Sequence, residues 1–124
     1  MEYLPVPLSE APIASPLLIG WIQNAVAVRY RVRKADLLGP RRVRYVSNAR
    51  AVAMFLSREL TECSYPMIGH LFGDKDHSTV LYACRKVARQ AKSDPHLRSL
   101  LDAVRKEVGG EVATGPLTGL RTPP

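Results

Sequence analysis

The chain has 124 residues, a length that favours a single domain. Eighteen basic residues stand against 11 acidic ones, so the net charge of +7 favours an anionic partner, either nucleic acid or a membrane surface. The two cysteines, Cys63 and Cys84, lie apart in the sequence and suggest no disulfide framework, so we expect reduced cytosolic thiols.

Proline and glycine concentrate at both ends of the chain. Residues 1–16 hold four of the ten prolines, and residues 109–124 hold three more together with four glycines. We therefore expect an irregular segment at 1–16, one folded domain at 17–108 and a flexible tail at 109–124. Residues 11–28 carry no charge, but prolines and amides interrupt them, so we interpret them as part of a soluble protein and not as a membrane span.

Apolar residues recur at helical spacing and nowhere alternate convincingly with period two, so the predicted fold class is all-α. The first helix is expected at about 17–31, with these residues facing inward: Trp21, Ile22, Ala25 and Val26. A short helix at 35–38 stops at a Gly-Pro pair, and a basic loop follows at about 39–46.

A longer helix is expected at about 47–62, with Ser47 or Asn48 as its N-cap. Arg50 and Arg58 are expected to point away from its buried stripe, which contains Ala49, Val52, Ala53, Leu56 and Leu60. A last helix at about 94–107 begins with an Asp-Pro pair, and its inward residues are Leu97, Leu100, Leu101 and Val104.

Between them lies the pattern of a helix-turn-helix. A helix at 65–72 begins after Ser64, a Gly-containing turn occupies 73–75, and a second helix at 76–90 begins with Asp76 as N-cap. Three apolar residues of the first helix, Ile68, Leu71 and Phe72, are expected to pack on the second.

The second helix has two different faces. Its expected apolar face consists of Val80, Cys84, Val87, Ala88 and Ala91, and its polar, basic stripe consists of Ser78, Tyr82, Arg85 and Arg89. The N-terminal tip carries Lys75, Asp76, His77 and Ser78. Free N–H groups and the positive end of the dipole make such a tip suitable for phosphates or base edges, as in a recognition helix that enters the major groove.

At this point the sequence resembles the C-terminal DNA-binding domain of the bacterial replication initiator DnaA. The run from Gly73 to Val87 matches the family signature almost residue for residue. The similarity covers about residues 22–90 and includes the upstream segments Ala35–Leu38, Arg41–Arg44, Ala53–Met54, Arg58–Thr61, Ile68–Gly69 and Phe72–Gly73.

The resemblance implies sequence-specific binding of double-stranded DNA at a DnaA-box-like site, in regulation of replication initiation or transcription. It implies base contacts by Arg42 in the minor groove and, in the major groove, by Asp76, His77, Ser78 and Thr79. The residues expected at the DNA backbone are Arg41, Arg44, Arg50, Arg58, Lys75 and Arg85. The loop arginines are expected to stand away from acidic groups.

The sequence departs from the family at several positions. Ser78 stands where threonine is usual, Tyr82 replaces a common histidine, and Asn48, Ala49 and Ala51 replace Arg, Pro and Gln. No Gly-x-x-x-x-Gly-Lys-[Ser/Thr] motif occurs, so we expect no P-loop ATPase module, no ATP binding and no enzyme activity.

Other functions remain open at this stage. Two cysteines and two histidines fall at intervals of seven (Cys63, His70, His77 and Cys84), but the close ligand pairs of a structural zinc site are missing, so we expect no metal and no cofactor. The main alternative is a protein–protein adaptor with the same fold, and other replication or transcription proteins are possible partners. A peripheral membrane protein fits less well, because the basic residues adjoin a helix tip instead of a Trp- and Leu-rich helix face. We expect a cytoplasmic, nucleoid-associated protein.

Overall fold

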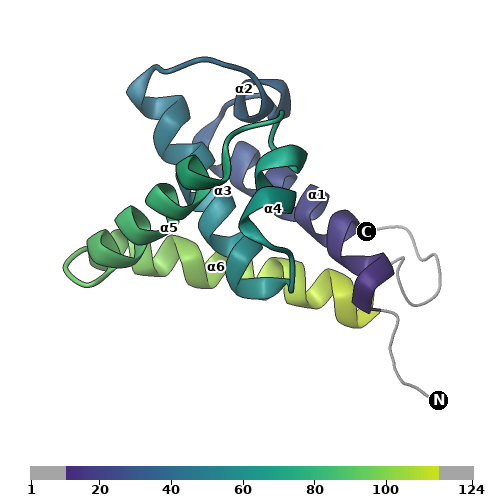
Figure 1. The fold of residues 1–124 in the computed structure, drawn as a ribbon. Helices are drawn as coiled ribbons and strands as arrows, with labels where there is room; N and C mark the ends of the chain where they lie inside the picture. The colour runs from purple at the N-terminus through teal and green to yellow at the C-terminus, as the bar shows by residue number, and fades with distance from the viewer. Residues whose placement is uncertain (1–10, 115–124) are drawn as a thin grey trace.

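The computed structural model describes the backbone of residues 11–114 and the side chains of residues 16–109. That part contains six helices and no strand, so the predicted all-α fold class is confirmed (Figure 1). They are α1 (Ala11–Tyr30), α2 (Lys34–Leu38), α3 (Arg44–Leu60), α4 (Tyr65–Leu71), α5 (His77–Ala91) and α6 (Pro95–Thr114). Within this part, no helix is both long and apolar enough to cross a membrane.

The two outer helices are longer than the sequence indicates. α1 begins at Ala11 and α6 continues to Thr114, so the expected irregular structure at 11–16 and 109–114 is wrong. Proline and glycine disfavour a helix by about 3 and about 1 kcal/mol, and tertiary packing can offset such costs. α1 and α6 lie against each other and bury apolar side chains on both. Residues 1–10 and 115–124 lie outside the described residues.

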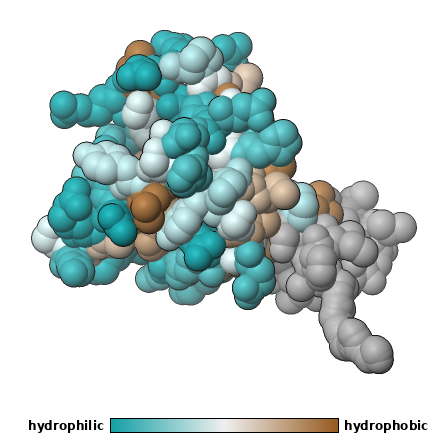
Figure 2. Space-filling view, in the orientation of Figure 1, coloured by the Kyte–Doolittle hydropathy of each residue, from teal (hydrophilic) through white to brown (hydrophobic). Residues whose placement is uncertain are grey.

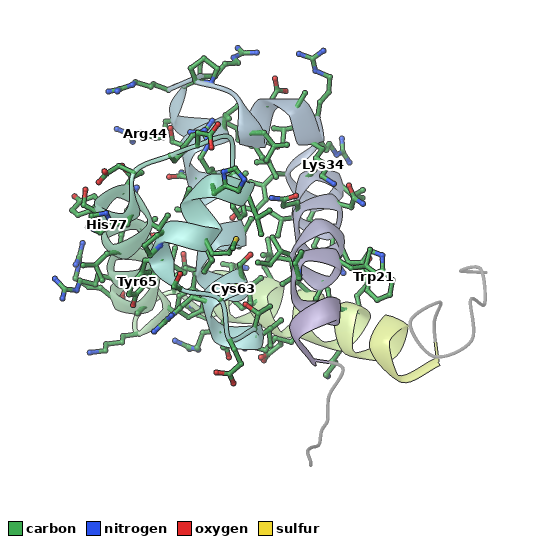
Figure 3. The ribbon with its side chains drawn as sticks, turned by 45° about the vertical axis from the view of Figure 1, so that its right-hand side comes forward. Trp21, Lys34, Arg44, Cys63, Tyr65 and His77 are labelled. Atoms are coloured by element: carbon green, nitrogen blue, oxygen red, sulfur yellow. The ribbon has the colours of Figure 1, made fainter. Side chains whose placement is uncertain are left out.

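The core forms around α3, which packs against α1 on one side and α5 on the other (Figure 1). The fully buried side chains of this core include Ile22, Val26, Leu56, Phe72, Val80 and Val104. Trp21 is not among them, and Figure 3 shows it projecting from α1 on the side away from His77. Trp21 is only partly buried, so the prediction that it faces the core is wrong.

The start of α3 also differs from the prediction. The helix begins at Arg44 after the N-cap residue Val43, which makes no side-chain capping bond, so neither Ser47 nor Asn48 is the cap. Val46 is only 4% exposed, and its burial favours helical structure before Ser47. The basic loop is accordingly shorter than expected and spans residues 39–43.

The helix-turn-helix is confirmed. The Ser64 side chain caps α4 by accepting a hydrogen bond from the Met67 amide at 3.2 Å. In the turn, Gly73 and Asp74 have positive φ angles of 87° and 59°, and the Lys75 amide donates to the Gly69 carbonyl at 2.8 Å. This compact turn fixes α4 against α5 and determines where the tip of α5 lies.

Candidate nucleic-acid interface

The tip of α5 is a capped and solvent-exposed helix start. Asp76 is the N-cap, as predicted, and its carboxylate accepts a hydrogen bond from the Ser78 amide at 2.9 Å. The Ser78 hydroxyl also donates to this carboxylate, and these bonds lower the pKa of Asp76 from its ordinary value. His77, Ser78 and Thr79 are exposed, so the four residues expected to read bases stand together at an accessible surface.

The arginines of the basic loop and of the start of α3 are exposed as well: Arg41, Arg42 and Arg44. Figure 3 shows Arg44 and His77 on the same side of the molecule. Contrary to expectation, Arg41 does have an acidic neighbour, because its guanidinium lies 3.9 Å from the Asp36 carboxylate.

A groove joins the basic loop to α5. Pro40 and Arg42 line it from the loop, Ser47 lines it from α3, and Asp76 and Thr79 line it from the start of α5. The structure therefore brings together the arginine expected in a minor groove and two of the residues expected in the major groove. They come from segments more than thirty residues apart in the sequence.

Two further predicted residues lie on the other flank of α5. Arg58 and Arg85 line a shallow depression together with Tyr65. The Arg58 guanidinium stacks 4.3 Å above the Tyr65 ring and donates to the Cys63 carbonyl at 2.9 Å. Ala88, expected in the core, is exposed and lines the same depression. These arginines are accessible to a backbone that passes along α5.

Arg50 is among the residues that line the groove, but its side chain does not point outward as predicted. It is only 8% exposed, and it turns inward to the carboxyl end of α2. Its Nε donates to the Leu37 carbonyl at 2.7 Å and its Nη2 to the Asp36 carbonyl at 2.8 Å, so the expectation of an outward side chain is wrong. A helix C-terminus leaves carbonyls without partners and carries the negative end of the dipole, which attracts a cation. Burial lowers the pKa of the Arg50 guanidinium.

Lys75 is half-buried and does not extend freely from the tip. Its Nζ donates to the Leu38 carbonyl at 3.1 Å and to the Phe72 carbonyl at 2.8 Å. Burial and, to a lesser extent, the nearby Arg50 charge lower the pKa of Lys75. Its side chain therefore holds the backbone of the turn, in contrast to the exposed basic position expected for it.

The ion pairs of the described residues are unevenly distributed. Arg29 pairs with Glu107 at 2.8 Å, and Arg105 pairs with Glu59 at 3.0 Å. Among residues 16–109, in contrast, no carboxylate lies within 4.0 Å of the charged groups of Arg42, Arg44, Arg85 or Arg89. Among the described residues, these four arginines therefore have no acidic partner, and they lie near the loop and along α5 on a largely hydrophilic side of the molecule (Figure 2).

Sequence reasoning missed several residues that line the groove, among them Ser47, Tyr82 and Lys86. Tyr82 is 68% exposed and follows Thr79 by one helical turn, Lys86 follows on the same helix, and Ser47 lines the groove from α3. The Lys86 ammonium lies 3.5 Å from the Asn48 side-chain oxygen. The outward stripe of α5 already contained the signal for Tyr82, whereas Ser47 was expected as an N-cap and lies instead inside α3. Within the described part of the chain, no three potential metal-ligating side chains come together.

Comparison with known proteins agrees with this geometry. Residues 19–87 match the family model described as the bacterial dnaA protein helix-turn-helix. The chain is 47% identical over 90 residues to the chromosomal replication initiator protein DnaA of Lactobacillus delbrueckii subsp. bulgaricus, covering 73% of this chain and 20% of the relative. It is 38% identical over 96 residues to the same-named protein of Thermodesulfovibrio yellowstonii, covering 77% of this chain and 22% of the relative.

The chain thus spans about a fifth of the length of these relatives. The match covers their C-terminal DNA-binding part, which is non-catalytic, and does not include the ATPase module. The match and the helix-turn-helix geometry lead to the same conclusion: the chain belongs to the family of DnaA helix-turn-helix domains, which bind double-stranded DNA.

Proposed function

We propose that this domain recognises a short DnaA-box-like sequence by contacting two adjoining grooves of one duplex. The groove that Arg42 and Thr79 line together is the observation that supports this proposal most directly. Arg42 extends into the minor groove, while Asp76, His77, Ser78 and Thr79 read base edges in the neighbouring major groove.

The exposed arginines supply the backbone contacts in this proposal. Arg41, Arg44 and Arg85 bind phosphates, and Arg58 binds one at the far flank of α5. With about four phosphates neutralised, the logarithm of affinity should fall with the logarithm of salt concentration with a slope of about −3.6.

Two properties of Asp76 fit a role at the bases. The hydrogen bonds from Ser78 keep the carboxylate ionised, so it can accept a hydrogen bond from a cytosine amino group. The same bonds hold the carboxylate in one orientation. Ser78 offers a hydroxyl but lacks the methyl group of threonine, so its apolar contact with a thymine methyl is smaller than in most of the family.

The biological role follows from the sites that the domain occupies. By binding DnaA-box-like sites, it would act on replication initiation or on transcription, and it would be found with the nucleoid. Further partners would be other proteins that assemble at such sites. The alternative of a protein adaptor predicts no preference for duplex DNA.

The test is to measure the binding of a fluorescent DnaA-box duplex and of a scrambled duplex by anisotropy. We expect His77→Ala and Arg42→Ala to lose their preference for the box while retaining most binding to scrambled DNA. Lys106→Ala on α6 removes one exposed positive charge outside the proposed interface, so it is the matched control and should keep the preference. Equal losses on both duplexes would show that His77 and Arg42 contact only phosphates. No rise in anisotropy with either duplex would favour the adaptor.

A further inference from the structure

The carboxyl end of α2 is stabilised in an unusual way. The last carbonyls of a helix have no partner within the helix and are commonly bonded by a left-handed glycine motif. Here Gly39 follows α2 with an extended backbone, at φ −88° and ψ −174°, and cannot form that motif. Side chains bond the carbonyls instead.

Four consecutive carbonyl groups, those of residues 36–39, accept hydrogen bonds from two cations. Arg50 donates to the carbonyls of Asp36, Leu37 and Gly39 at 2.8, 2.7 and 3.1 Å. Lys75 donates to the remaining carbonyl, that of Leu38, at 3.1 Å. The two side chains come from different parts of the fold, because Arg50 belongs to α3 and Lys75 to the turn before α5.

These bonds connect the basic loop to the helix-turn-helix. The loop leaves α2 directly at Gly39, where Arg50 binds, and Arg42 follows three residues later. Lys75 also donates to the Phe72 carbonyl at 2.8 Å, so one ammonium group bridges the end of α2 and the turn. A Cβ atom at Gly73 would lie 1.8 Å from the Leu38 oxygen, which shows how closely the two backbones approach.

We propose that Arg50 and Lys75 are positioning residues that fix the base of the Arg42 loop relative to the tip of α5. The inference rests on the proposed two-groove binding mode. Two contacts on one duplex reinforce each other only when the connection between them holds both in register. Arg50 and Lys75 supply that connection through their bonds to the carbonyls of residues 36–39, and both also line the groove between the loop and α5.

A double-mutant cycle tests the proposal with the full chain and the box duplex. Affinities are measured for the wild type, Arg42→Ala, Arg50→Met and the double variant, at a temperature where circular dichroism shows each to be folded. We expect Arg42→Ala to weaken binding about tenfold in the wild type. In the Arg50→Met background the same change should cost less than about twofold, because a displaced loop no longer delivers Arg42 to the minor groove.

His77→Ala is the internal control. Its cost should be the same with and without Arg50→Met, because the tip of α5 depends on Asp76 and the turn. Arg50→Lys retains one donor and should restore part of the Arg42 effect. If Arg50 only stabilises the fold, Arg42→Ala should weaken DNA binding by the same factor in the wild type and in the Arg50→Met variant. That result would overturn the proposal.

Lys75→Met provides an independent measurement if Arg50→Met does not fold. It removes one bond to α2 and one to the turn, and it should also reduce the Arg42 effect. An unchanged Arg42 effect in the Lys75→Met variant would likewise count against the inference. Failure of the two-groove mode itself has a different signature, because Arg42→Ala would then cost nothing even in the wild type.

Discussion

Gly69 permits the close contact between α4 and the turn that precedes α5. A Cβ atom at this position would lie 2.1 Å from the Lys75 carbonyl oxygen and 3.2 Å from its carbonyl carbon. The obstacle is backbone, and the Lys75 amide is bonded to the Gly69 carbonyl at 2.8 Å. In Gly69→Ala, the turn must therefore move away from α4 by about an ångström, with partial loss of that bond.

The size of the effect follows from three contributions. Overpacking a tight contact costs about 1–3 kcal/mol, and the weakened hydrogen bond costs about 1 kcal/mol. Replacing glycine by alanine inside a helix stabilises the helix by about 1 kcal/mol. The net destabilisation is then about 2 kcal/mol, which lowers the Tm of a domain of this size by about 8–16 °C.

Thermal unfolding followed by far-UV circular dichroism measures this shift, and Gly109→Ala is the matched control. Gly109 lies in α6, and a Cβ atom there meets nothing within 4 Å. The free energy of unfolding of Gly109→Ala should be about 1 kcal/mol higher than that of the parent, and its Tm should be about 4–8 °C higher. The Tm values of the two variants should therefore shift in opposite directions. A Gly69→Ala protein as stable as the parent would refute the assigned contact between α4 and the turn.

Three further outcomes are expected. Tyr82→Ala should weaken box binding several-fold without changing Tm, because the ring is exposed in the groove; unchanged affinity in anisotropy would remove Tyr82 from the interface. Hydrogen bonds from Arg33 and Ser78 lower the pKa values of Asp36 and Asp76. The two ionised carboxylates therefore stabilise the folded state above pH 3.8, their ordinary pKa, and this stabilisation is lost as the pH falls through their lower pKa values in the folded protein. Urea unfolding over that acid range should show a falling free energy of unfolding. Asp36→Asn combined with Asp76→Asn should make the free energy of unfolding depend less steeply on pH. Finally, a thiol reagent should modify Cys63 before Cys84, whose pKa is raised by burial; simultaneous reaction would contradict the packing of α5 on α3.

Local signals in the sequence were sufficient for most of the architecture. Asp76 and Ser64 cap their helices as predicted, because an N-cap depends on bonds within a few residues. The apolar faces of α3 and α5 were predictable for a similar reason, since burial follows helical periodicity. The family match extends this success to the class of ligand.

Tertiary contacts account for the errors. The periodicity of α3 places Arg50 beside its buried stripe, but nothing in the local sequence reveals that the end of α2 lies there and offers carbonyls. The bonds of Lys75 could not be predicted for the same reason, because its partner Leu38 is 37 residues away in the sequence. The early start of α3 at Arg44 was missed for a similar reason, because Val43 makes no side-chain capping bond and Val46 is buried by the rest of the fold.

The most direct test of two-groove binding is methylation interference on one box duplex. Dimethyl sulfate modifies guanine N7 in the major groove and adenine N3 in the minor groove, so a single experiment reports on both. We expect interference at both kinds of site within about one helical turn, and the minor-groove signal alone should disappear in Arg42→Ala. Interference confined to one groove, or a minor-groove signal that persists without Arg42, would contradict the account.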